Sequence, residues 1–227
     1  MASSIVLPVS AIHHRHPSQL PSACLPTQRW QPVQRHATPA AYPPPPPPRT
    51  IRVRWTPPRT GWYKLNFDGS VLHDGSGRAS IGGAIRDSAG RVAAAFAERT
   101  PHAPIGVVEA RALIRGLRLA EDGGFIHRLV VEGDDLTLVR LLRGESRQTR
   151  ISRDVEEDIL ELLGRFRGGC EVHQHVYREG NRVADALCHE AYRCPGVWID
   201  RTVPFRVYEK VEDDRHGVAH DRALLRV

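Results

Sequence analysis

The chain has 227 residues, enough for one domain of ordinary size plus terminal segments, whereas two full domains would be a tight fit. Its formal net charge of +6 is distributed unevenly: residues 1–67 hold eight of the 32 Lys and Arg and none of the 26 Asp and Glu, which leaves 24 bases against 26 acids, or −2, in residues 68–227. This excludes a uniformly basic domain, so any nucleic-acid site after residue 67 must depend on local patches and metal ions.

Composition argues against two further classes of protein. The four cysteines show no CxxC spacing, and a chain of this size does not need disulfide bonds for stability, so we expect reduced thiols. No apolar run approaches the ~20 residues that a membrane-spanning helix requires. The sequence therefore predicts neither a disulfide scaffold nor a membrane protein.

The first 50 residues differ in composition from the rest of the chain. They are rich in Ser, Ala, Pro, Gln and His, and they end near a run of six prolines at 43–48, which favours an extended polyproline II spacer. We expect 1–50 to be a disordered leader and 51–61 a linker. The start also has the composition of an organellar transit peptide, which predicts a plastid or mitochondrion. A plain disordered leader has the same composition and leaves the cytoplasm or the nucleus as alternatives.

From Trp62 onward, the pattern indicates alternating strands and helices. Residues 62–68 alternate as a half-buried strand, and 80–98 indicate two strands joined by a tight turn, so an antiparallel meander is expected. The later elements are a helix (107–124), a strand (127–133), two helices (134–144 and 152–167), a strand (170–177) and a helix (180–193). The order β-β-β-α-β-α-α-β-α predicts an α/β fold in which helices cover a mixed sheet. Residues 194–227 are left as an unassigned C-terminal tail.

Four carboxylates lie at the edges of these elements: Asp68, Glu109, Asp134 and Asp185. Glu109 shares the apolar face of its helix, and an ionised carboxylate stays buried only when it is paired with a cation such as Arg or bound to a metal. The other three have structural alternatives. Asp68 could start a turn, Asp134 or Asp135 could cap a helix, and Asp185 is favoured in a first helical turn.

The segments that hold these acids resemble the four motif segments of the type 1 ribonuclease H family, in particular its plant, retroelement-related branch with reverse-transcriptase-like domains. The segments are LNFDGS (65–70), VEARALIRGLRLAEDGG (108–124), VVEGDD (130–135) and HVYREGNRVADAL (175–187). The resemblance covers residues 62–193. It implies a ribonuclease H-like fold, with a five-stranded mixed sheet whose first three strands are antiparallel.

The resemblance also implies a chemistry and its residues. The four acids match the catalytic acids of the family, which would hold two Mg²⁺ ions, with Mn²⁺ as a substitute, for hydrolysis of the RNA strand of an RNA:DNA hybrid. His175 matches a loop histidine that assists the reaction, although it also suits an ordinary strand position. Gly69 and Ser70 are candidates for contacts in the minor groove of the hybrid.

One departure from the family keeps a second interpretation open. Only residues 145–151 separate the two middle helices, too few for the inserted basic helix with which some family members bind hybrids. The chain would then be a nucleic-acid-binding or interaction module that has kept the fold and lost turnover, and a third interpretation is a retroelement fragment without a selected function. We expect an enzyme that acts on nucleic acid, with a monomer as the default state.

Overall fold

The computed structural model describes residues 49–124, 127–145, 151–172, 175–200 and 202–224. The expected leader therefore lies outside the described residues, except for its last two positions. Within the described ranges, no helix combines the length and the apolar character that crossing a bilayer demands. The three cysteines in these ranges are free.

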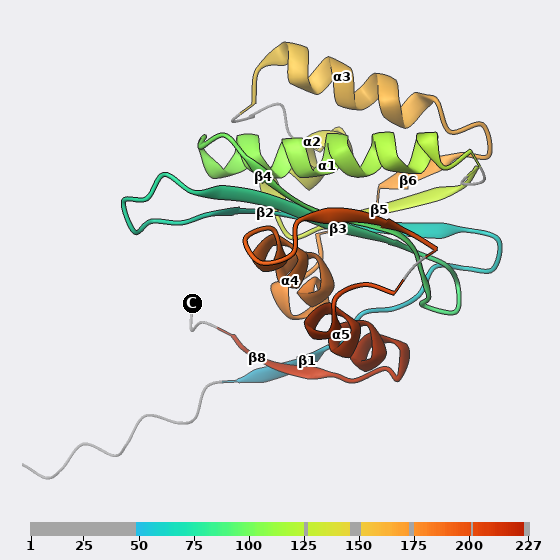
Figure 1. Ribbon diagram of the computed structural model, residues 1–227. Coiled ribbons are helices and arrows are strands. Elements are labelled where there is room, and N and C mark those ends of the chain that lie inside the picture. Colours follow the sequence, from blue (N-terminus) through green and yellow to red (C-terminus); the bar gives the residue numbers. More distant parts are fainter. Residues whose placement is uncertain (1–48, 125–126, 146–150, 173–174, 201, 225–227) are drawn as a thin grey trace, which may run out of the picture. The chain divides into compact units, whose positions relative to one another are not determined.

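A six-stranded mixed sheet forms the centre of the protein, with the strand order β6-β5-β2-β3-β4-β7 (Figure 1). The strands are β2 (Tyr63–Val71), β3 (Ala79–Arg86), β4 (Val92–Thr100), β5 (Leu129–Gly133), β6 (Cys170–Val172) and β7 (Gly196–Ile199). β2, β3 and β4 form an antiparallel meander, while β5 pairs parallel to β2, and β6 pairs parallel to β5. The expected mixed sheet is confirmed, and β7, antiparallel to β4, adds a sixth strand to the five expected.

Helices cover both faces of this sheet (Figure 1). One face carries α1 (Ile105–Asp122), α2 (Leu136–Leu142) and α3 (Arg153–Gly164), and the other carries α4 (Arg182–Glu190) and α5 (Phe205–Arg215). The apolar positions of α1 recur at helical spacing and pack on Leu65 and Phe67 of β2. On the other face, Leu187 of α4 shares a core with Val207 and Val211 of α5. The two cores hold the sheet between two helical layers.

Two glycines allow α1 and α4 to approach the sheet closely. A Cβ atom at Gly69 would lie 2.7 Å from the backbone nitrogen of Glu109 in α1. A Cβ atom at Gly82 would lie 2.5 Å from the backbone nitrogen of Cys188 in α4. Since Gly82 is the cross-strand partner of Asp68, the two helices contact the sheet next to that acid.

Two segments that were expected to lie outside the domain contain regular structure. β1 (Thr50–Val53) starts at the boundary of the expected leader and linker and pairs antiparallel with β8 (His220–Ala223). The expected tail supplies β7, α5 and β8. β1, β7 and β8 have four residues each, too few for a clear periodic pattern, and most residues of α5 are charged.

A buried arginine explains why both segments join the fold. Arg86 of β3 is 0% exposed, and its guanidinium donates to Asp214 of α5 (2.6 Å) and to Asn66 of β2 (2.8 Å). The ring of Trp55, from the expected linker, lies 3.6 Å from the guanidinium carbon. A buried charge requires such partners, and here the linker and the tail provide them.

Candidate active site

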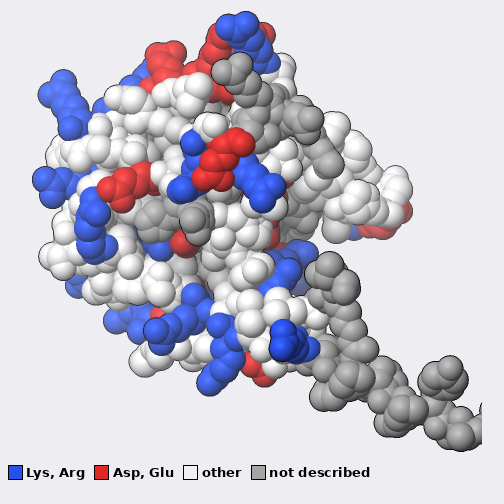
Figure 2. All heavy atoms as spheres, turned by 180° about the vertical axis from the view of Figure 1, so that it is seen from behind, with Lys and Arg blue, Asp and Glu red and all other residues white. Residues whose placement is uncertain are grey.

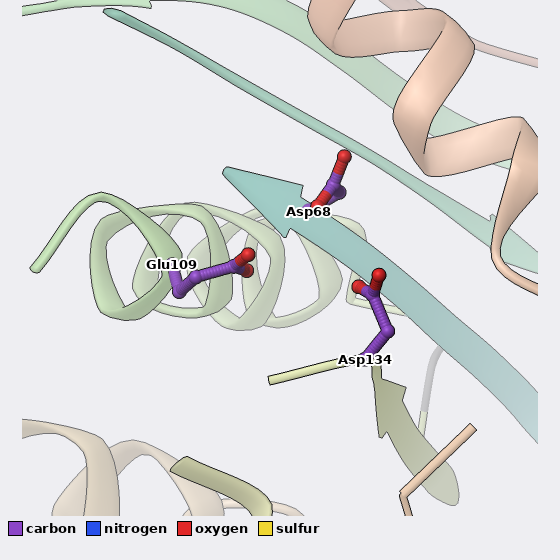
Figure 3. A group of neighbouring side chains, drawn as sticks. All are labelled: Asp68, Glu109 and Asp134. Carbon is purple, nitrogen blue, oxygen red and sulfur yellow. The ribbon is translucent and has the colours of Figure 1, made fainter. Parts of the chain in front are cut away.

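Three of the four predicted acids meet at one edge of the sheet (Figure 3). Asp68 lies near the end of β2, Glu109 in the second turn of α1, and Asp134 directly after β5. Each offers an oxygen atom, and these atoms all lie within 4.8 Å of one another. β2 and β5 are parallel and pair Phe67 with Gly133, so their carboxyl ends bring the two aspartates together.

The surroundings of the three carboxylates disfavour their charged forms. Asp68 is 6% exposed and Glu109 is 5% exposed. Burial, followed by the charges of Asp134 and Asp185, raises the pKa of Asp68 to about 7. Burial and the charges of Asp68 and Asp134 raise the pKa of Glu109 well above its ordinary value, and burial raises the pKa of Asp134. The fold therefore holds these three carboxyl groups close together, although their mutual repulsion and their removal from water oppose this arrangement.

The fourth acid lies beside this cluster and outside it. Asp185 is in the first turn of α4, and its Oδ1 accepts a hydrogen bond of 2.7 Å from Nη2 of Arg178. Its side chain is 29% exposed. The charge of Asp185 contributes to the raised pKa of Asp68, so it acts electrostatically on the cluster. The dipole of α4 favours an acid at this position, as the structural alternative expected, and a catalytic role of Asp185 stays a prediction.

Asp134 and Asp135 have separate tasks. Asp135 is the N-cap of α2, and its side chain accepts a hydrogen bond of 2.9 Å from the backbone nitrogen of Leu138. Asp134 makes no such capping contact and belongs to the acidic cluster. The sequence allowed either Asp134 or Asp135 to cap the helix, and in the structure Asp135 is the capping residue.

Asn181 belongs to the site, although its position directly before α4 is typical of a helix cap. Its side chain makes no capping hydrogen bond. Its Nδ2 instead donates to Oδ1 of Asp134 (2.9 Å) and to the backbone oxygen of Phe67 (2.9 Å). This amide connects the start of α4 to β2 and orients Asp134. The sequence feature that could have indicated this role is the position of Asn181, one helical turn before Asp185.

The remaining predicted residues lie around the cluster. His175 falls after the end of β6, which is shorter than the predicted strand, and its Nε2 lies 2.9 Å from the backbone oxygen of Asp134. The ring of Tyr177 packs edge-on against the imidazole. Gly69 is buried beneath α1, whereas Ser70 is partly exposed near the end of β2. Of the two proposed groove contacts, Ser70 is the one with an accessible side chain.

The donor set fits a divalent cation. Carboxylate oxygens are the ligands that Mg²⁺ and Mn²⁺ prefer. Oε2 of Glu109 is buried and has no hydrogen-bond partner among the described residues, which is costly for a carboxylate unless a cation binds it. A bound cation would also relieve the repulsion within the cluster. Asp68, Glu109 and Asp134 could therefore hold a metal ion.

Known proteins share both the sequence pattern and the fold. Residues 66–191 match the family described as reverse transcriptase-like. A protein of Arabidopsis thaliana named for ribonuclease H is 31% identical over 185 residues, which make up 78% of this chain and 28% of that protein. The chain thus spans less than a third of that relative's length.

Solved structures include ribonuclease H1 of the halophilic archaeon Halobacterium salinarum NRC-1, with a TM-score of 0.53 and 28% identity over 58% of this chain and 98% of that one. LC11-RNase H1, solved in complex with an RNA/DNA hybrid, has a TM-score of 0.51 at 24% identity over 57% of this chain and 95% of that one, which shows the fold alone. The match of the family model over more than half of the chain confirms the predicted family: the chain belongs to the reverse-transcriptase-like, plant retroelement-related branch of the ribonuclease H family.

Proposed function

We propose that this domain hydrolyses the RNA strand of RNA:DNA hybrids with the help of divalent metal ions held by Asp68, Glu109, Asp134 and Asp185. One observation carries the proposal: the buried carboxylates of Asp68 and Glu109 and the half-buried carboxylate of Asp134 converge within 4.8 Å, and one oxygen of Glu109 has no hydrogen-bond partner among the described residues. A cluster built only for stability would include a compensating cation. Family membership adds the substrate class as an expectation.

The residues around the cluster suit a phosphoryl displacement. When bound, two Mg²⁺ ions, or Mn²⁺ in their place, activate water and stabilise charge on the leaving oxygen. Asp68 and Glu109 offer ligands from two elements that Gly69 holds in contact, and Asn181 fixes the orientation of Asp134. These contacts hold the oxygen donors in place before the substrate arrives, which lowers the reorganisation that the reaction requires.

Two side chains at the rim would assist. Arg178 is largely exposed and binds Asp185, so its guanidinium can contact a phosphate next to the fourth acid. His175 is partly buried beside Asp134 and can carry a proton between the site and solvent. Both belong to the segment 175–181, which passes along the carboxyl edge of the sheet.

The test is cleavage of a labelled RNA:DNA hybrid by the full chain in Mg²⁺, in Mn²⁺ and in EDTA, with an RNA duplex and a DNA duplex as controls. We expect metal-dependent cutting confined to the RNA strand.

Asp134→Asn should lower the rate by at least about 10²-fold, because it removes a charged oxygen from the cluster. Asp135→Asn is the matched control, since Asn caps a helix as well as Asp does, and its rate should change less than about 3-fold. Hybrid binding without cleavage in either metal would contradict the proposal and favour a binding module that has lost turnover.

A further inference from the structure

We infer that the groove between α4 and α5 binds the sugar-phosphate backbone of the nucleic acid where it passes away from the carboxylate cluster. The inference rests on the proposed function, because it adds a contact surface for the same substrate. The groove has a volume of about 400 Å³. Its lining contains five basic side chains, Arg182, His189, Arg193, Arg206 and Lys210.

The groove is continuous with the candidate active site. Asp185, the fourth predicted acid, also lines it. His189 lies one helical turn further along α4, with its Nε2 3.7 Å from Oδ2 of Asp185. A strand whose scissile phosphate lies at the acids can therefore extend along α4 toward α5.

The two cations that α5 contributes to the groove have no ion-pair partner among the described residues. Arg206 is exposed and Lys210 is partly exposed, and neither makes an ion pair with any residue that the structure describes. They are four residues apart, so they share one face of the helix. By contrast, Arg182 of the same groove pairs with Asp213 at 3.1 Å, and Arg193 lies 3.7 Å from Glu190. A phosphate group would supply the negative partner that the protein does not provide.

The groove cations differ from other unpaired cations by their place next to the candidate active site. Residues 68–227 carry a net charge of −2. On the opposite helical layer some exposed arginines are paired, for example Arg153 with Glu157 and Arg165 with Glu161, while others have no ion pair among the described residues. Seen from behind, blue predominates over red in the lower half of the molecule, on the side of the sheet that α4 and α5 cover (Figure 2). Even with the acids Asp185 and Glu190 in its lining, the groove has four Arg and Lys side chains, besides His189, against two acids.

α5 lies outside the part of the chain that the family model matches. The family match ends at residue 191, before α5 begins. The segment between α2 and α3, where some relatives carry a basic helix, is short in this sequence. α5 therefore presents unpaired cations to the substrate from a different part of the chain.

The test compares two double variants that remove the same charge from the full chain. Arg206→Ala/Lys210→Ala removes the unpaired cations of the groove. Arg118→Ala/Arg167→Ala is the control, because Arg118 in α1 and Arg167 shortly after α3 are both exposed and have no ion pair among the described residues. Binding of a short RNA:DNA hybrid is measured by fluorescence anisotropy in EDTA over a salt series, where metal-dependent cleavage does not interfere.

The groove variant should bind about 10-fold more weakly, and the slope of log K against log salt should fall by about 1.8, or about 0.9 for each lost phosphate contact. The control should stay within about 2-fold of the native chain with an unchanged slope. The charge-conserving Arg206→Lys/Lys210→Arg chain should bind as the native one does. Thermal unfolding checks that all variants are folded.

Kinetics separate this inference from the proposed function. In cleavage assays, the groove variant should raise KM about 10-fold and leave kcat unchanged, since the contact is the same in the ground and transition states. If the native chain binds hybrids and does not cut them, a weakened groove variant still supports the groove, while the nuclease proposal fails. If the native chain cuts hybrids, and the groove variant matches the control in affinity and salt slope, the groove inference is overturned.

Discussion

One face of β2 carries two kinds of buried polar residue. Some have partners that compensate their charge or polarity, and one lies beside other acids, so comparing them helps to separate structural residues from candidate functional ones. Lys64, Asn66 and Asp68 alternate along the strand and are all nearly inaccessible. Nζ of Lys64 donates to Glu132 at 3.1 Å, and Nδ2 of Asn66 donates to the same carboxylate at 3.0 Å. Asp68, two residues further, lies next to other acids instead.

The neighbouring strand β5 repeats this contrast. Glu132 is the cross-strand partner of Asn66 and is enclosed by a cation and an amide, whereas Asp134, just beyond the strand, faces Asp68 and Glu109. The two strands thus carry one balanced group of charges and one unbalanced group only two residues apart. Burial of a polar residue alone does not indicate a site, but a buried charge without compensation does.

The largest effect is expected in the balanced group, which Arg86 of β3 joins through its hydrogen bond to Asn66. Asp214→Ala should lower the free energy of unfolding by about 3–5 kcal/mol, because it leaves Arg86 charged and buried without its main partner. Urea unfolding measures this change. Asp213→Ala is the control, since Asp213 is partly exposed and its pair with Arg182 should contribute no more than about 1 kcal/mol. Equal losses in the two variants would show that the Arg86 network is not the source of stability.

The unbalanced group should respond in the opposite way. Asp68→Asn should keep or raise the free energy of unfolding, because it removes a charge from a repulsive cluster. It should nevertheless lower kcat by about 10²–10³-fold, since it removes a metal ligand. Unfolding in urea and hybrid cleavage are measured on the same preparation. If Asp68→Asn lowered the free energy of unfolding as much as Asp214→Ala does, Asp68 would be a charge that stabilises the fold, and the prediction would be wrong.

Sequence reasoning succeeded where the information is local. The alternation of β2 and the helical spacing of α1 predicted both elements, and the apolar neighbours of Glu109 indicated a buried acid. The meeting of Asp68 and Asp134 was expected only from the resemblance to the family, and the parallel pairing of β2 with β5 supplies its physical reason. The grouping of these three acids follows from the fold, whereas their catalytic roles stay predictions.

The remaining features depend on contacts between distant parts of the chain. Arg86 and its partner Asp214 are 128 residues apart, so no short window around either residue indicates the pair. The role of Asn181 was missed for the same reason, because the preference of Asn for helix caps explains its position without reference to Asp134. β1 and β8 come from opposite ends of the domain, and each is too short for a clear periodic pattern.

The cluster should also make stability depend on pH. The pKa of Asp68 is raised to about 7, and those of Glu109 and Asp134 are also raised, so the folded state binds protons more tightly than the unfolded chain does. In EDTA, the contribution of these groups to stability is complete at low pH and is lost as the pH rises toward and through about 7. Mg²⁺ replaces the protons and should restore at least about 1 kcal/mol near neutral pH.

Thermal unfolding in EDTA and in Mg²⁺ at about pH 5 and about pH 7.5 measures this dependence. The Mg²⁺-induced rise in Tm should be larger at the higher pH and should be absent in Asp68→Asn protein. A rise of the same size at both pH values would show that metal binding is not linked to these carboxylates.

The smallest effect is expected at His175, whose hydrogen-bond contact with the unbalanced group involves a backbone atom. Its Nε2 lies beside the backbone oxygen of Asp134, so His175→Ala leaves the carboxylates in place and removes a group that can transfer protons. We expect kcat to fall by about 10-fold, at the low end for general acid–base groups, with KM and Tm unchanged. His102→Ala, at an exposed position, is the control. A loss of Tm with kcat unchanged would assign His175 to the balanced, structural class instead.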